Sequence, residues 1–205
     1  MKRVAISQQA DFLVQRGESR DSLDQRLVYF LQSAGFLAVP VPNLSTWLET
    51  SQIWDSQPLV EWLREIVPDA LVLSGGQDIG KSPARDFTES SLLDYADFAG
   101  IPVLALCRGM QVMAHRAGTG LRPVAGHVRS RHELIGEIKG RVNSYHNYSL
   151  ETCPRGFRIL ARSEDGEIEA IAHNSRSWQG WMWHPEREIP FSPADIERVR
   201  LLFGE

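Results

Sequence analysis

Cysteine, long apolar runs and excess positive charge are all scarce in this sequence. Two cysteines among 205 residues are too few for a disulfide scaffold. No apolar run approaches the roughly 20 residues that span a bilayer, and the stretch at residues 4–6 is too short for a secretory signal. The net charge of −4 argues against a nucleic-acid-binding surface. We therefore expect a cytoplasmic protein with no nucleic-acid or membrane partner, in a reducing compartment that keeps thiols free.

The ligand spacing of a metal site is also missing. The sequence holds six histidines and two cysteines, but none of them cluster at the spacing typical of structural zinc sites. We therefore expect neither a metal nor an organic cofactor.

What is present is the pattern of an α/β domain. A hydrophobic fraction of 42% is ordinary for a globular chain, and the length is sufficient for one domain over residues 1–205. Strands are predicted at 4–6, 37–41, 70–73 and 102–106. Helices are predicted between them at 22–34, at 90–99, and in pieces over 47–67 with a break at Pro58. This alternation predicts a three-layer fold, with helices on both faces of a mostly parallel central sheet.

The C-terminal half has a different pattern. Short strands are predicted at 132–138, 142–144, 158–161, 168–173 and 178–183. Glu164-Asp-Gly166 is a hairpin signal between two of them, and a closing helix at 193–203 has Ser192 as its N-cap. We therefore expect extra antiparallel strands that extend the same sheet.

A cysteine at the end of an apolar strand is the most informative feature of the chain. Cys107 follows the run 103–106 and precedes Arg-Gly and a helical pattern, which is the strand–turn–helix layout of a nucleophile elbow. The N–H groups of the new helix would favour the thiolate, which is the reactive form of cysteine. A buried structural cysteine is the alternative, because free cysteines are often buried.

A histidine and a carboxylate follow another apolar strand. His184 comes directly after the run 178–183, and Glu186 stands two residues later. Because a catalytic imidazole needs an orienting carboxylate, we predict a triad of Cys107, His184 and Glu186. A strand end followed by a simple turn is the alternative.

Two glycines follow the predicted strand at 70–73. Gly75 and Gly76 would lie at the carboxyl edge of the sheet, where α/β proteins bind ligands. A glycine N–H can approach a substrate carbonyl oxygen closely, and together with the N–H of Arg108 it would form an oxyanion hole. A structural turn is the alternative.

A polar and aromatic run at residues 141–148 is a candidate substrate wall. It contains Ser144, Tyr145 and His146, and this density favours binding over a solvated loop. We assign no function to three other residues: His115, Cys153 and His173.

Basic residues occur at two further places. One is a small island, made of His127, Arg129, Arg131 and His132. We interpret the island as exposed loop charge, with anion binding as the alternative. The other is the segment 20–26, which opens the first predicted helix with Asp21 as a candidate N-cap. Capping does not account for Arg20 or Arg26.

The motifs together resemble those of class I glutamine amidotransferases. They are Ser74-Gly-Gly, Cys107-Arg-Gly-Met-Gln111, Asn143-Ser-Tyr-His146 and His184-Pro-Glu186. Their order and spacing match the family over essentially the whole chain. The resemblance implies a flavodoxin-like fold and hydrolysis of a γ-glutamyl amide through a cysteine thioester. It implies that Cys107 is the nucleophile, His184 the base and then the acid, and Glu186 the orienting group.

The same resemblance implies roles for the surrounding residues. Gly76 and Arg108 would lend the oxyanion N–H groups, and Gly75 and Gln111 would hold the glutamyl moiety. Residues 144–146 would lie along its α-amino and carboxylate groups.

Arg108 and the segment 20–26 indicate a branch of the family. An arginine after the cysteine is similar to free-standing γ-glutamyl hydrolases, and no length remains for a synthetase domain. The segment 20–26 is similar to a subgroup that acts on γ-glutamyl-CDP-amidate in making phosphoramidate for capsule or lipopolysaccharide. There a diphosphate needs cationic partners. The candidates are Arg20, Arg26, Arg129 and Arg131, together with His127.

Three alternatives stay open at this point. One is hydrolysis of a γ-glutamyl amine such as γ-glutamyl-γ-aminobutyrate. Another is a glutaminase subunit that feeds ammonia to a synthetase, and the third is an inactive binding module. A homodimer is also left open.

Overall fold

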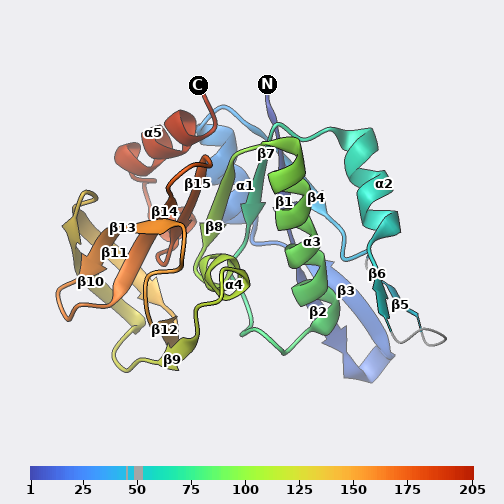
Figure 1. The fold of residues 1–205 in the computed structure, drawn as a ribbon, viewed down its shortest axis with the longest axis horizontal. Helices are drawn as coiled ribbons and strands as arrows, with labels where there is room; N and C mark the ends of the chain where they lie inside the picture. Colours follow the sequence, from blue (N-terminus) through green and yellow to red (C-terminus); the bar gives the residue numbers. More distant parts are fainter. Residues whose placement is uncertain (45, 49–52) are drawn as a thin grey trace.

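A nine-stranded mixed sheet runs through the whole molecule (Figure 1). The computed structural model describes residues 1–44, 46–48 and 53–205. The strand order is β11-β10-β13-β14-β15-β8-β7-β1-β4. The five parallel strands are β1 (Arg3–Ser7), β4 (Leu37–Val41), β7 (Ala70–Leu73), β8 (Val103–Leu106) and β15 (Trp178–Trp181). The antiparallel extension consists of β10 (Val128–Gly136), β11 (Gly140–Tyr145), β13 (Phe157–Ser163) and β14 (Ile168–His173).

Helices cover both faces of the sheet, so the predicted three-layer α/β architecture is confirmed. One face packs against α1 (Gln25–Ser33) and α5 (Pro193–Leu202). The other face packs against α2 (Gln57–Ile66), α3 (Pro83–Ala99) and α4 (Arg108–Arg116). Strands β7 and β8 are buried at every position, as expected of parallel strands covered on both sides. This burial explains why both strands are continuous apolar runs in the sequence.

The C-terminal elements match the sequence expectation closely. Strands β13 and β14 form the predicted antiparallel hairpin. Helix α5 is capped by Ser192, whose Oγ accepts a hydrogen bond from the Asp195 N–H at 3.3 Å. A short 3-10 helix, η2 (Pro185–Arg187), follows β15 and packs beside α1.

The first helix is present, but the prediction that it starts at residue 22 with Asp21 as its N-cap was wrong. Residues before the first helix form a two-stranded ribbon of β2 (Gln9–Leu13) and β3 (Glu18–Ser22), joined by η1 (Val14–Arg16) and Gly17 at φ +60°. Helix α1 starts later, and Asp24 is its N-cap. Asp21 instead accepts hydrogen bonds from the backbone and side-chain nitrogens of Asn43, so the loop after β4 anchors the ribbon.

The prediction of helical pieces over 47–67 was also wrong in its first part. Strands β5 (Thr46–Leu48) and β6 (Ile53–Asp55) pair there, while residues 49–52 lie outside the described residues. Pro58 does not break a helix but stands in the first turn of α2, where its missing N–H costs no hydrogen bond. Helix α3 begins at Pro83 rather than at residue 90. A small pair of strands, β9 (Leu121–Pro123) and β12 (Tyr148–Leu150), was not predicted.

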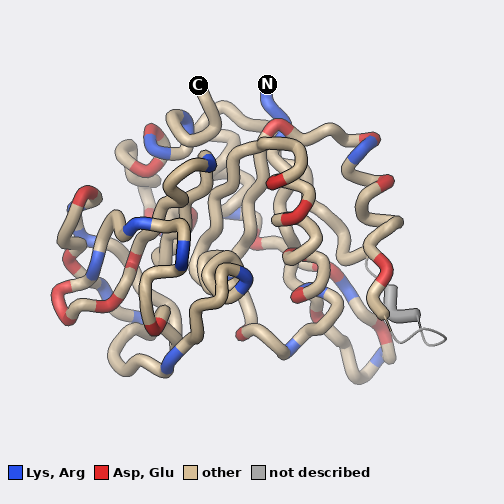
Figure 2. The backbone as a smooth tube through the Cα atoms, in the orientation of Figure 1, with Lys and Arg blue, Asp and Glu red and all other residues tan. Residues whose placement is uncertain are grey.

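Basic and acidic residues are interspersed around the fold (Figure 2), in keeping with the net charge of −4. Among the described residues, every helix is too short or too polar to cross a membrane.

Candidate active site

Cys107 occupies the tight turn between β8 and α4. Its backbone adopts φ 49° and ψ −108°, a conformation that costs a non-glycine residue about 1–3 kcal/mol. The Cys107 N–H donates to the Trp181 carbonyl at 2.7 Å, which ties the turn to β15. A Cβ on Gly109 would lie 2.4 Å from the Leu73 carbonyl oxygen, so only glycine lets α4 approach β7 this closely. The strand–turn–helix geometry predicted around Cys107 is therefore confirmed.

The three residues of the predicted triad meet at this edge of the sheet. His184 follows β15 and is the N-cap of η2, which carries Glu186. The His184 Nδ1–H donates to Glu186 Oε1 at 2.6 Å, and the nearby Cys107 side chain acts to raise the pKa of the imidazole. All three are nearly buried, with exposed fractions of 6% for Cys107, 2% for His184 and 3% for Glu186.

The surroundings of His184 favour its protonated form. Burial acts to lower the pKa of His184, but the charge of Glu186 and the interaction with Cys107 outweigh it and raise this pKa to about 9. An imidazolium that persists at neutral pH stabilises a neighbouring thiolate. The site can therefore hold a nucleophile and a proton donor side by side.

Three neighbours fix the position of His184. Asn143 of β11 receives the His184 N–H on its Oδ1 at 2.9 Å and donates from Nδ2 to the His184 carbonyl at 2.8 Å. Tyr145 meets the imidazole edge to face, with ring centroids 5.8 Å apart. Gly75 lies against the ring, because a Cβ there would come within 2.5 Å of His184 Cε1.

A buried arginine holds the glycine loop after β7. Arg85 Nη2 donates to the carbonyl oxygens of Ser74 at 3.0 Å and Gly75 at 2.9 Å. Gly76 has φ +145°, and a Cβ there would lie 2.3 Å from Arg85 Nη1, so the position requires glycine. The loop is therefore held rigidly at the carboxyl edge of the sheet, as an oxyanion hole requires.

Arg108 belongs to the same buried charge network, which was not predicted from the sequence. Its guanidinium pairs with Glu89 and Asp86 of α3. Glu89 also accepts from Arg85 Nε at 2.9 Å and from Ser7 Oγ at 2.8 Å. The network joins the turn after Cys107 to the glycine loop. The spacing of Arg85 and Glu89 on one helix face, with Asp86 beside them, was the available signal.

A cleft opens beside His184 and the glycines. Its lining residues are Gln9, Ser22, Leu23, Asp24, Leu27, Ser74, Gly75, Gly76, His184, Glu186 and Arg187. Arg187 also stacks its guanidinium over the Tyr145 ring at 4.5 Å. It is a cation of the site that was not identified from the sequence.

Three predicted substrate contacts are engaged with the protein itself. Gln111 Nε2 donates to the Tyr148 carbonyl at 3.0 Å. Ser144 Oγ donates to the His127 carbonyl at 2.7 Å, and His146 is only 2% exposed. These partners direct Ser144 and His146 into the interior, whereas Tyr145 stands against the catalytic histidine.

The predicted phosphate-binding arginines lie mostly on the surface. Arg20, on the β2–β3 ribbon, pairs with Glu18, and Arg131 pairs with Glu188 at 3.1 Å. Arg129 is exposed in a bulge of β10 at φ 55°. Arg26 is closer to the cleft, because it pairs with the lining residue Asp24 at 2.7 Å.

The interpretation of the basic island as an exposed loop was wrong for its two histidines. His127 and His132 are only 1% and 7% exposed, and residues 128–136 form strand β10. The structure brings both histidines together with His146 and Glu169, and these four side chains are candidate metal ligands. Because they come from separate elements, their spacing along the chain gave no sign of the cluster.

Comparisons with known proteins show which family this chain resembles. The family model for class-I glutamine amidotransferases matches residues 18–190. The γ-glutamyl-CDP-amidate hydrolase of Campylobacter jejuni is 32% identical over 125 residues, which are 58% of this chain and 62% of that protein. A glutamine-hydrolyzing GMP synthase subunit of Thermococcus kodakarensis is 31% identical over 161 residues, covering 74% of this chain and 83% of that protein.

Solved structures show the same fold. A GMP synthase subunit from Thermoplasma acidophilum superposes with a TM-score of 0.71 at 20% identity, covering all of this chain and 93% of that one. A glutamine amidotransferase from Thermotoga maritima gives a TM-score of 0.61 at 16% identity, covering 98% and 82%. Because the family model matches most of this chain, the chain belongs to the class I glutamine amidotransferase family.

Proposed function

We propose that this chain is a cysteine-dependent hydrolase of γ-glutamyl amides, with Cys107, His184 and Glu186 as its catalytic residues. The observation that carries the proposal is the meeting of a strained cysteine turn with a buried His–Glu pair at one edge of the sheet. Members of the family hydrolyse glutamine or γ-glutamyl amides, so the chemistry and the geometry agree.

The reaction follows from these groups. The Cys107 thiolate attacks the γ-carbonyl carbon, and the oxyanion is received by the N–H groups of Gly76 and Arg108. The C–N bond breaks as the His184 imidazolium donates its proton to the leaving nitrogen. Water then attacks the thioester while His184 takes a proton from it, which releases glutamate and restores the Cys107 thiolate and the His184 imidazolium.

We favour γ-glutamyl-CDP-amidate as the substrate, giving glutamate and cytidine diphosphoramidate for capsule or lipopolysaccharide decoration in the cytoplasm. The Campylobacter relative carries that name, although this chain matches only 62% of it. A second cavity beside Gly76 contains Asn43, Trp54 and Lys81, which could contact a base and a phosphate. Its carboxylates, such as Asp11 and Asp21, would oppose a diphosphate, so the choice of leaving group depends chiefly on the relative.

A glutaminase subunit is the second candidate. Several relatives are named as glutamine-hydrolyzing subunits of GMP synthases, and two of them cover 60% and 74% of this chain, against 58% for the Campylobacter hydrolase. In that case the chain would pass ammonia to a synthetase partner and would hydrolyse glutamine slowly when alone.

The test offers the purified chain three compounds: γ-glutamyl-CDP-amidate, γ-glutamyl-γ-aminobutyrate and glutamine. The rate of glutamate release is measured for each compound, and the values of kcat/KM are compared. We expect the nucleotide conjugate to be hydrolysed fastest. Comparable or faster turnover of the amine conjugate would reject γ-glutamyl-CDP-amidate as the substrate, while the proposed hydrolysis of γ-glutamyl amides would stand. Slow turnover of all three, together with a co-purifying synthetase, would favour the glutaminase subunit.

A further inference from the structure

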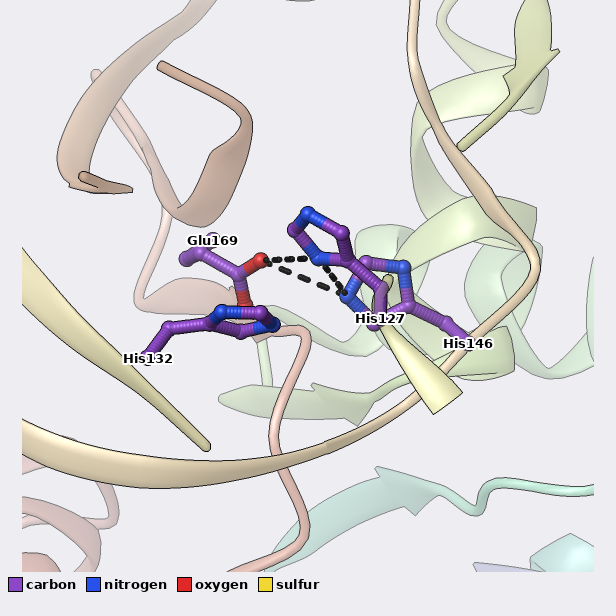
Figure 3. A group of neighbouring side chains, drawn as sticks. All are labelled: His127, His132, His146 and Glu169. Carbon is purple, nitrogen blue, oxygen red and sulfur yellow. Dashed lines mark hydrogen bonds and ion pairs between the residues drawn. The ribbon is translucent and has the colours of Figure 1, made fainter. Parts of the chain in front are cut away.

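Three histidines and a glutamate meet inside the antiparallel half of the sheet, outside the catalytic triad (Figure 3). His127 directly precedes β10 and His132 lies within it, while His146 follows β11 and Glu169 lies in β14. Their exposed fractions are 1%, 7%, 2% and 0% in that order. The atoms that could bind a metal all lie within 4.8 Å of one another.

Three of these atoms form a nearly equilateral triangle. His127 Nδ1 lies 3.2 Å from His146 Nε2 and 3.4 Å from Glu169 Oε1, and the third side measures 3.3 Å. Ligands of tetrahedral zinc, with bonds of about 2.0–2.1 Å, are separated from each other by about 3.3–3.4 Å. The triangle therefore has the size of one face of a zinc coordination tetrahedron. The His132 ring adjoins the ring of His127, with centroids 4.1 Å apart, and its ligand atom lies within 4.8 Å of the other three.

The outer nitrogens of two rings have partners that can only accept hydrogen bonds. His127 Nε2 lies 2.8 Å from Asp165 Oδ2, and His146 Nδ1 lies 3.1 Å from the Tyr148 carbonyl oxygen. Both outer nitrogens therefore carry a proton, and in the neutral imidazoles, the form that binds a metal, the lone pairs of His127 Nδ1 and His146 Nε2 are directed inward. A carboxylate or a carbonyl behind each histidine is the usual support of a metal-binding imidazole.

The interior of the cluster is rich in electron pairs. Two imidazole lone pairs and Glu169 Oε1 converge, and Glu169 Oε2 is buried without a hydrogen-bond partner among the described residues. Electron donors packed this closely repel one another unless a metal cation or a shared proton lies between them, and buried carboxylates are paired or bind metals. Imidazole and carboxylate together suit zinc and its neighbouring transition metals.

We propose that His127, His132, His146 and Glu169 bind one Zn²⁺ ion. Four protein ligands complete a tetrahedron, so the site is closed to substrate and structural in kind. The ion would fasten β10, β11 and β14 to one another. Strand β11 also carries Asn143, which holds the backbone of His184, so the metal would stabilise the strand on which the catalytic histidine is positioned.

Metal binding by the purified full-length chain tests the proposal. The protein is cleared with a chelator and titrated with Zn²⁺ against a chromophoric zinc indicator, and with Co²⁺ as a spectroscopic probe. We expect one equivalent of Zn²⁺ per chain, a higher Tm with Zn²⁺, and the intense visible bands of four-coordinate Co²⁺. A chain that binds neither ion, or binds Co²⁺ only with the weak spectrum of a hydrated ion, overturns the proposal.

Matched variants locate the ion. His146→Gln should lower zinc affinity by more than about 100-fold, while Asp165→Asn, on a half-exposed side chain behind His127, should lower it about 10–100-fold. His115→Gln, on the exposed face of α4, and Cys107→Ala should each retain the full equivalent. Because Asp165 is at the surface, its variant should fold even where His146→Gln does not. Zinc binding that survives Asp165→Asn unchanged, or that is lost in Cys107→Ala, contradicts the proposed site.

Discussion

The molecule contains two buried histidine–glutamate groups that use the same residue types differently. In the parallel half, His184 and Glu186 adjoin Cys107, and both line a cleft. In the antiparallel half, Glu169 meets three nearly buried histidines, and hydrogen-bond acceptors lie at the outer nitrogens of two of them. The first group lies beside a cleft that can admit a reacting molecule. The second group brings its candidate metal-ligand atoms within 4.8 Å of one another.

The difference shows that residue type does not decide whether such a group reacts or supports the fold. What decides it is access and the number of electron donors that converge on one point. One carboxylate and one imidazole beside a thiol create a proton donor next to a nucleophile. Three imidazoles and a carboxylate in a closed space create a set of ligands.

Removing the thiol should give the largest effect. Cys107→Ala should lower γ-glutamyl hydrolysis on the order of 10⁴-fold or more, because no other group can form the thioester. The measurement is glutamate release by the purified variant, with its fold checked by circular dichroism. Cys153→Ala is the control and should keep wild-type turnover. Substantial activity in Cys107→Ala would remove the basis of the catalytic assignment.

The acid–base half of the comparison can be tested with Glu186→Gln. The wild-type kcat/KM should fall as pH rises through about 9, because the His184 imidazolium then loses the proton it gives to the leaving group. Without the Glu186 charge the pKa of His184 falls, so this basic limb should move to lower pH. Turnover at the optimum should drop on the order of 10²-fold. An unchanged basic limb would show that another group titrates there.

The buried charge network beside the active site can be disrupted at Glu89. Glu89→Gln leaves Arg85 and Arg108 without their shared buried carboxylate, and loss of one partner from such a pair costs about 3–5 kcal/mol in the free energy of unfolding. Urea denaturation measures this difference. Glu65→Gln, at an exposed position of α2, is the control and should stay within about 0.5 kcal/mol of wild type. Equal stability of the two variants would show that the network contributes little.

The smallest effect is expected at the predicted phosphate contacts. Arg26→Gln should raise KM for γ-glutamyl-CDP-amidate by a few-fold, about 1 kcal/mol, because Arg26 pairs with a residue of the cleft. Arg20→Gln, on the exposed ribbon, should have little effect. Both variants should hydrolyse a small γ-glutamyl amide normally. A larger KM change for Arg20 than for Arg26 would place the nucleotide over the ribbon instead.

Much of the parallel half could be predicted because its signals are local. The strands at 70–73 and 103–106 are continuous apolar runs, Cys107 directly follows the second of them, and His184 directly follows the apolar run 178–183. The segment 9–22 was missed because its ribbon is mostly exposed and lacks a strong alternating pattern. Arg85 and Glu89 were missed because a helical charge pair usually lies at the surface, whereas here both side chains are buried.

The amino-acid order alone determined the layered α/β class, the elbow at Cys107 and the strand ends that carry the triad. Apolar periodicity and backbone preferences act over a few residues, so each of these features is readable where it stands. Only the tertiary structure decided that His127, His132, His146 and Glu169 meet, since β10, β11 and β14 bring together positions up to 42 residues apart. Sheet pairing is set by the packing of the whole chain, and no short stretch contains that information.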